Sequence, residues 1–171
     1  MRIVAGEWRG RAIRPPRDER VRPTSDKVRE AWLSIVRLSV PDALVLDLFA
    51  GSGALGLEAL SRGATRCDFV ELSAPSLRAI RENAEALGAG DRAVIHRGDA
   101  VRFVAGLAAG AYDLAFADPP YGLGLAAQVA ERWLEVPYAE VLGVEHSTRD
   151  PMPAGGDLRR YGTTAITFYR R

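Results

Sequence analysis

The string Asp118-Pro119-Pro120-Tyr121 combines hydrogen-bond acceptors with a backbone that has few donors. Each proline removes a backbone N–H and holds the residue before it in an extended conformation, so the turn is stiff. The Asp118 carboxylate and the Pro119 carbonyl therefore suit the exocyclic NH₂ group of a nucleobase, which has two donors. The Tyr121 ring can stack on the face of such a base. The turn predicts chemistry on the amino group of a purine.

The amino group of guanine or adenine is a poor nucleophile, because its lone pair is delocalised into the ring. Acceptors that hold both N–H bonds orient the nitrogen toward a methyl carbon, and such alignment contributes up to about 7 to 11 kcal/mol in favourable cases. The methylated ammonium is acidic enough to lose its proton afterwards, so no strong base is needed. We therefore expect methyl transfer to a purine amine.

A glycine-rich string, Asp47–Gly56, stands where a predicted strand meets a predicted helix. Gly51 and Gly53 allow the backbone to approach a ligand closely, and the helix start offers unpaired N–H groups. Glu71, twenty residues beyond Gly51, can accept hydrogen bonds from both hydroxyls of a ribose. Asp99 follows the next strand and can reach an adenine amino group. These residues predict a site for either a dinucleotide or S-adenosylmethionine.

Asp47 favours S-adenosylmethionine, because its carboxylate would repel a pyrophosphate but attract an ammonium and a sulfonium. An NAD-binding oxidoreductase remains an alternative. Against it, Lys27 is the single lysine and lies outside the predicted α/β body, and the Asp118 turn has no evident role in hydride transfer. A non-catalytic RNA-binding or assembly factor is a third possibility, which intact Asp118 and Glu71 make improbable.

The elements that must position these residues alternate along the chain. Apolar runs typical of buried parallel strands occur at 43–49, 67–72, 93–96, 112–117 and 140–145. Segments of helical length separate them, at 54–62, 74–87, 100–108 and 123–135. A terminal antiparallel hairpin is predicted over 158–161 and 164–169. Such alternation predicts an α/β doubly wound fold.

The N-terminal part of the chain differs from the rest in charge. Residues 1–37 hold nine Arg and one Lys against five acids, a net of +5, whereas the remainder carries a net of −4. Because phosphate contacts dominate nucleic-acid affinity, this segment predicts RNA or DNA contact. We expect a hairpin and a helix within residues 1–40, as a basic RNA-binding extension, and a catalytic body over residues 41–171.

Composition excludes several classes of protein. The chain has 171 residues, of which 47% are hydrophobic and 26% charged, as expected of one globular domain. No apolar run approaches the roughly 20 residues of a membrane span, so we expect a cytoplasmic protein without membrane contact. Cys67 has no partner for a disulfide and should lie in the core. With His96 and His146 it makes no plausible zinc ligand set, so no metal is expected.

Several strings together resemble the RsmD family of 16S ribosomal RNA guanine-N2 methyltransferases, which are class I S-adenosylmethionine-dependent enzymes. The likeness is carried by Arg2–Arg11, Arg22–Glu30, Asp47–Glu58, Asp118–Tyr121, Tyr161–Gly162 and Thr167–Tyr169. It implies a Rossmann-like fold with a mostly parallel seven-stranded sheet that ends in an antiparallel hairpin. It also implies S-adenosylmethionine as cofactor.

The implied reaction is methylation of the N2 amine of a guanine in 16S rRNA, with an assembled or partly assembled small ribosomal subunit as the partner. Adenine-N6 methylation of RNA or DNA is the nearest alternative, because the Asp118 turn suits either purine. A DNA enzyme normally needs a target-recognition domain, for which a chain of 171 residues has little room.

The resemblance assigns roles to individual residues. Those expected to hold the target base and act in catalysis are Asp118, Pro119, Pro120 and Tyr121. Those expected to bind the cofactor are Asp47, Phe49, Ala50, Gly51, Ser52, Gly53, Glu71, Leu72, Asp99 and Ala100. Those expected to contact RNA are Arg9, Arg11, Arg22, Thr24, Lys27 and Arg29. Thr24 could instead cap a helix or line the active site, and His146 is expected to be a hydrogen-bonded histidine at a strand end.

Overall fold

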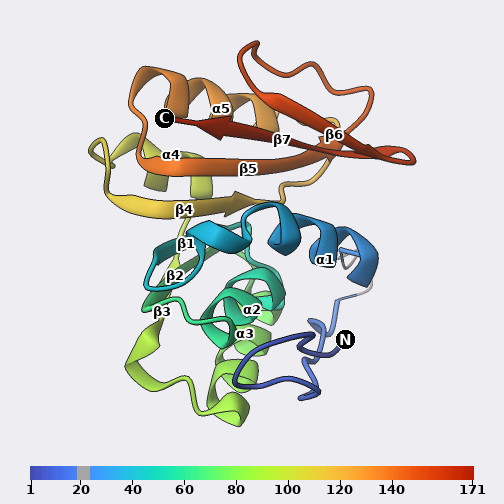
Figure 1. Ribbon diagram of the computed structural model, residues 1–171, viewed down its shortest axis with the longest axis vertical. Coiled ribbons are helices and arrows are strands. Elements are labelled where there is room, and N and C mark those ends of the chain that lie inside the picture. Colours follow the sequence, from blue (N-terminus) through green and yellow to red (C-terminus); the bar gives the residue numbers. More distant parts are fainter. Residues whose placement is uncertain (19–23) are drawn as a thin grey trace.

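A seven-stranded sheet forms the centre of the computed structural model, which describes residues 1–18 and 24–171 (Figure 1). Within the described residues the strand order is β3-β2-β1-β4-β5-β7-β6. The strands are β1 Leu44–Leu48, β2 Arg66–Glu71, β3 Ala93–Arg97, β4 Tyr112–Ala117, β5 Ala139–Ser147, β6 Asp157–Tyr161 and β7 Thr164–Arg170. The first five are parallel, and β7 pairs antiparallel with both β5 and β6. The predicted fold class is confirmed.

Helices cover both faces of this sheet. One face carries α1 (Asp26–Ile35), α2 (Ala54–Ser61) and α3 (Ala74–Leu87), whose apolar side chains share one cluster with the sheet. The other face carries α4 (Ala100–Ala105) and α5 (Leu125–Glu135), which contribute to a second cluster. Short 3₁₀ turns lie at Arg37–Ser39 and Gly90–Arg92.

The sequence of β1 is nearly continuously apolar because the strand is buried on both of its faces. Val45 packs into the cluster under α1, α2 and α3, while Leu46 and Leu48 pack into the cluster under α4 and α5. Because side chains alternate along a strand, Asp47 shares the side of Val45 and is directed toward the layer that contains α1. This polar residue in a buried strand is thereby placed next to the N-terminal part of the chain.

Two helices differ from their predicted bounds for reasons visible at their ends. Helix α5 begins at Leu125 and not at Leu123, because Gly124 has a φ of 73° and forms its N-cap. Helix α4 ends at Ala105, three residues early, where Gly106 forms the C-cap. At the start of α5, Gly124 has a left-handed backbone conformation, which glycine adopts at little cost.

The predicted N-terminal hairpin forms as one antiparallel bridge and not as a pair of regular strands. The two segments approach each other, since the Ile3 N–H donates to the Arg11 carbonyl oxygen at 2.9 Å, but only the Arg2–Ala12 pair forms a bridge. The intervening backbone binds α2 instead. The N–H groups of Val4 and Ala5 donate to the Glu58 carboxylate at 3.0 to 3.1 Å.

The N-terminal segment also shares a hydrophobic core with the body of the protein. Ile3, Trp8 and Ile13 are buried and belong to the same cluster as Val45 and Phe116 of the central strands. Cys67 is fully buried in this cluster, as expected. The division into residues 1–40 and 41–171 therefore remains a prediction about RNA contact, because the two parts pack as one unit.

Candidate active site

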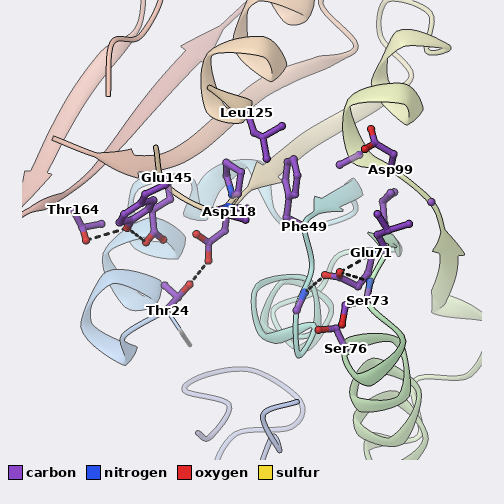
Figure 2. A pocket seen from close by; sticks show the side chains of 18 of the residues that line it. Thr24, Phe49, Glu71, Ser73, Ser76, Asp99, Asp118, Leu125, Glu145 and Thr164 are labelled. Carbon is purple, nitrogen blue, oxygen red and sulfur yellow. Dashed lines mark hydrogen bonds between the residues drawn. The ribbon is translucent and has the colours of Figure 1, made fainter. Parts of the chain in front are cut away.

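A cavity of about 830 Å³ opens at the carboxyl ends of the parallel strands (Figure 2). It lies where β1 and β4 are neighbours but send their following helices, α2 and α5, to opposite faces of the sheet. Ligands bind at such switch points in open α/β sheets. Its lining includes Thr24, Phe49, Gly51, Glu71, Leu72, Ser76, Asp99, Ala100, Asp118, Pro119, Pro120, Tyr121, Leu125, Glu145 and Thr164.

Glu71 anchors the glycine loop on one wall of this cavity. Its Oε2 accepts a hydrogen bond from the Gly51 N–H at 2.8 Å, and its Oε1 accepts from the N–H groups of Leu72 and Ser73 at 2.9 and 3.0 Å. Figure 2 shows this carboxylate bridging the loop and the start of α3. Carboxylate oxygens have further lone pairs, so Glu71 can still accept bonds from a ligand.

The loop itself needs glycine at two positions. Gly51 has a φ of 58° and no atom within 4 Å of a Cβ built on it, so strain and not space would oppose a side chain there. Gly53 has a φ of 81° and is the N-cap of α2. Both conformations lie in the left-handed region that favours glycine. The loop therefore makes a tight turn between β1 and α2, and its role in holding a cofactor stays a prediction.

Asp47 is buried at the base of the same loop. Its Oδ2 accepts a hydrogen bond from the Gly56 N–H at 3.0 Å. Burial raises its pKa well above the usual value, and the nearby carboxylates of Asp118 and Glu71 raise it further, against the lowering effect of the Gly56 bond. Asp47 lines a second, smaller cavity of about 90 Å³ that shares Thr24, Gly51 and Asp118 with the large one.

Asp99 both caps a helix and lines the large cavity. Its Oδ1 accepts from the Arg102 N–H at 2.9 Å, which caps α4, and the residue also lines the large cavity beside Ala100. A helix cap and a ligand contact are compatible, because the second carboxylate oxygen is not used in the cap.

Asp118 lies on the wall opposite Glu71, at the end of β4. The Thr24 hydroxyl donates a hydrogen bond to its Oδ2, and Figure 2 shows the two side chains directed toward each other. Burial raises the pKa of Asp118 to about 6, although the Thr24 bond acts in the opposite direction. The N-cap of α1 is Ser25, whose hydroxyl accepts from the Val28 N–H. Thr24 is therefore part of the cavity wall and not the helix cap.

Glu145 is a residue of this cavity that the sequence did not predict. The Tyr121 hydroxyl donates to its Oε1 at 2.7 Å and lies 3.1 Å from the Thr164 hydroxyl. Within the described residues its Oε2 is buried without a hydrogen-bond partner. Burial and the neighbouring Asp118 raise the pKa of Glu145 to about 8, while the Tyr121 bond lowers it. A carboxylate near the end of the strand beside β4 was the signal that could have found it.

The residues expected to contact RNA do not share one environment. Arg9 and Lys27 are exposed, and the exposed Arg11 donates from Nη2 to the Ala86 carbonyl oxygen at 2.6 Å. Arg22 lies outside the described residues. Arg29 is only 1% exposed, so the prediction of RNA contact on the protein surface is wrong for this residue. Its position on the inner side of α1 directs it into the protein.

His146 has the structural role expected of it. Its Nδ1 lies 2.8 Å from the Ser147 carbonyl oxygen and its Nε2 lies 2.7 Å from the Thr167 hydroxyl. It is buried and does not line the large cavity. Across residues 1–18 and 24–171 no group of three or more His, Cys, Asp or Glu side chains could hold a metal ion. The same residues include no helix long and apolar enough to cross a membrane.

The seven-stranded, mostly parallel sheet with antiparallel end strands is that of Rossmann-like methyltransferases. The fold is shared with an RNA methyltransferase from Salinibacter ruber solved in complex with S-adenosyl-L-homocysteine, at a TM-score of 0.67 and 14% identity over 87% of this chain and 93% of that one. The family model described as Conserved hypothetical protein 95, which corresponds to the RsmD family, matches residues 1–170. The chain belongs to this family.

Individual relatives agree with that assignment. Ribosomal RNA small subunit methyltransferase D of Escherichia coli is 39% identical over 125 residues, which are 73% of this chain but 62% of that protein's length. The protein of the same name from Haemophilus influenzae is 33% identical over 99% of this chain and 92% of its own. The solved structure of Escherichia coli yhhF superposes with a TM-score of 0.85 at 33% identity, covering 100% of this chain and 97% of that one.

Proposed function

We propose that this protein transfers the methyl group of S-adenosylmethionine to the exocyclic N2 amine of a guanine in small-subunit ribosomal RNA. The observation that carries the proposal is that two different groups of residues face each other across one cavity. Asp118, Pro119 and Tyr121 form a wall of acceptors and an aromatic ring, while Gly51 and Glu71 form a wall suited to a nucleoside. The names of the Escherichia coli and Haemophilus influenzae relatives support the choice of substrate.

The residues of the second wall fit S-adenosylmethionine by their chemistry. Glu71 offers acceptors for ribose hydroxyls, Asp99 with Ala100 lies at the place of an adenine, and Asp47 lies below the loop to face a positive charge. The cofactor supplies an electrophilic methyl group. The cavity of about 830 Å³ is large enough for both a nucleoside cofactor and a purine base.

The first wall orients the amine of the base. The Asp118 carboxylate and the Pro119 carbonyl accept its two N–H bonds, which directs the nitrogen lone pair into the cavity. Thr24 holds the Asp118 carboxylate in place through its hydroxyl. Asp118 is the stronger acceptor in its ionised form, and the proton released after methylation passes to solvent or to a neighbouring carboxylate.

A guanine inside a ribosomal RNA must leave its helix to enter this cavity, and the basic N-terminal residues are suited to hold the flanking backbone. Arg9, Arg11 and Lys27 are exposed. We place residues 1–40 at the RNA interface on the strength of their charge. The substrate in this proposal is an assembled or partly assembled small subunit.

The test uses small ribosomal subunits purified from cells that lack this protein. The subunits are incubated with the purified protein and isotopically labelled S-adenosylmethionine, and the RNA is digested to nucleosides for mass spectrometry. The expected product is labelled N2-methylguanosine as the single labelled nucleoside. Labelled N6-methyladenosine would assign the protein to adenine modification, and the absence of any labelled nucleoside would contradict the proposal.

A further inference from the structure

Arg29 is a buried cation whose hydrogen bonds are only partly satisfied. Its side chain is 1% exposed, and its Nη2 donates to the Arg2 carbonyl oxygen at 2.6 Å and lies 3.3 Å from Asp26 Oδ1. Within the described residues, Nε and Nη1 are buried without any hydrogen-bond partner. An unpaired polar group of this kind carries a substantial desolvation cost, and a charged group carries more. The two free nitrogens therefore indicate a missing anionic or strongly accepting ligand.

The place for such a ligand is the smaller cavity, of about 90 Å³, which Arg29 lines directly. The cavity lies between the start of α1 and the glycine loop, and it borders the large cavity through residues that line both. Those shared residues are Thr24, Phe49, Gly51 and Asp118. A molecule in the large cavity can therefore extend one end toward Arg29.

The charges around this smaller cavity select the kind of ligand. Arg29 carries the single cationic side chain among its described lining residues, beside the α-amino group of Met1, while Asp47 and Asp118 are carboxylates on the same lining. A phosphate carries only negative charge and would be repelled by both acids. A zwitterionic amino-acid group fits, because its carboxylate pairs with the guanidinium while its ammonium faces an acid.

We propose that Arg29 binds the α-carboxylate of the amino-acid end of the methyl donor. The inference rests on the proposed function, because it assumes that S-adenosylmethionine or its demethylated product occupies the large cavity. Arg29 is then a cofactor-binding residue contributed by the N-terminal helix, and its two free nitrogens supply charge-assisted hydrogen bonds.

The ligand can be altered without changing the protein. Binding of S-adenosylhomocysteine and of its decarboxylated analogue is measured by isothermal titration calorimetry with the wild-type chain. Loss of the carboxylate should weaken binding by at least about tenfold, the effect of one hydrogen bond to a charged group. Equal affinity for the two ligands would overturn the inference.

Two variants identify the guanidinium as the partner of that carboxylate. Arg29→Met should lower the affinity for S-adenosylhomocysteine by about 10- to 100-fold. It should change the affinity for the decarboxylated analogue by less than threefold. Arg29→Lys, which keeps the charge but loses the guanidinium geometry, should give an intermediate loss and serves if the methionine variant fails to fold. Arg37→Met, on an exposed arginine just beyond α1, is the matched control and should leave both affinities unchanged.

The outcomes separate this inference from the proposed function. An equal loss for both ligands in the Arg29 variants would give Arg29 a purely structural role, and a loss of RNA binding alone would assign it to a phosphate; either result overturns the inference. If the wild-type protein binds neither ligand, the proposed function fails together with it. If the wild type binds both ligands equally, only the role of Arg29 fails.

Discussion

Asp118 and Glu145 lie near the ends of neighbouring strands and share one cavity, although only Asp118 belongs to a recognisable string. Both carboxyl groups are buried, and both have raised pKa values. Their environments differ: a hydroxyl from the N-terminal part of the chain holds Asp118, whereas Tyr121 holds Glu145 from within the turn. The two groups influence each other, because the charge of Asp118 contributes to the raised pKa of Glu145.

Replacement of Asp118 by alanine should abolish methyl transfer while leaving cofactor binding nearly intact. We expect the transfer rate to fall at least about 100-fold, because the amine of the base loses an acceptor that orients it. The affinity for S-adenosylhomocysteine should change less than about threefold, since this carboxylate is assigned to the base. Single-turnover assays and calorimetry measure the two effects. Asp91→Ala, at an exposed turn, is the control, and equal losses of binding and transfer would refute the role of Asp118.

Glu145 should make the stability of the protein depend on pH. Its pKa is about 8 in the folded protein and 4.5 as a free side chain, so the folded state binds more protons between these values. The free energy of unfolding should therefore fall as pH rises from about 4.5 to 8, and Glu145→Gln should flatten that fall. Urea unfolding across this range measures it.

The matched control for that experiment is Glu131→Gln, on the exposed side of α5, which should leave the pH profile unchanged. If the free energy of unfolding of Glu145→Gln falls with pH as steeply as that of the wild type, the Glu145 carboxyl does not have a raised pKa in the folded protein.

At the residue level, site residues could be predicted from the sequence wherever a short motif restricts the backbone. Gly51, Glu71 and Asp118 lie on the cavity predicted for them, because turn chemistry and strand ends are readable from the chain. Arg29 was assigned to the surface and is buried, because the charge of a side chain does not reveal which side of its helix faces inward. Glu145 was missed because its importance arises only from the packing of β5 against β4.

Among the elements, the N-terminal segment is held by α2 more than by its own pairing. Glu58, 1% exposed, accepts from the N–H groups of Val4 and Ala5, and Ser61 accepts from Glu7 N–H with its carbonyl and from Trp8 N–H with its hydroxyl. The segment thus depends on two polar residues one turn of helix apart.

Gly6 is the point at which this segment approaches α2 most closely. A Cβ on Gly6 would lie 1.9 Å from the Ser61 carbonyl oxygen, and its φ is 89°. Gly6→Ala should therefore destabilise the protein by more than about 3 kcal/mol and make residues 1–13 sensitive to protease. Denaturant unfolding and limited proteolysis measure these effects.

Gly10→Ala separates crowding from backbone strain. Gly10 has a similar φ of 82° but nothing within 4 Å of a built Cβ, so only the strain term of about 1 kcal/mol should appear. Similar losses in the two variants would show that the contact with α2 is not tight.

Elements with strong periodic patterns could be predicted almost residue by residue, as β4 and α3 show. The terminal pairing of β6 and β7 around Gly162 was equally clear, since a turn glycine separates two alternating runs. The absence of regular strands at the N-terminus could not be predicted, because part of that backbone bonds to residues of α2 more than 50 positions away, and no local pattern encodes such partners.

Over the whole molecule, positive charge is concentrated in the first 37 residues while the rest is mildly acidic. The N-terminal segment packs against the body as part of one core, so this asymmetry belongs to a single rigid unit. Under the proposed function, a basic surface fixed on the body of the protein would orient the molecule on RNA before a base enters the cavity.

Neutralising Arg9, Arg11 and Lys27 together to glutamine should weaken binding to small ribosomal subunits and reduce its dependence on salt. Each lost phosphate contact lowers the slope of log affinity against log salt by about 1. Filter binding across a salt series measures the slope. The control removes three exposed arginines near the C-terminal end of the chain, Arg160, Arg170 and Arg171, which lie outside the basic segment, and it should leave the slope unchanged. An unaltered slope in the first variant would mean that these residues do not touch RNA.

The burial of Cys67 has a practical consequence for measuring how the protein binds RNA. The chain contains one cysteine, its thiol is fully enclosed, and burial raises its pKa well above the usual value, so thiolate-directed reagents should leave it unmodified. A single cysteine introduced on the surface, for example in place of Ser34 on α1, would then be the sole point of attachment for a fluorophore or spin label. The proposed binding to small ribosomal subunits could then be followed in real time with the native background left in place.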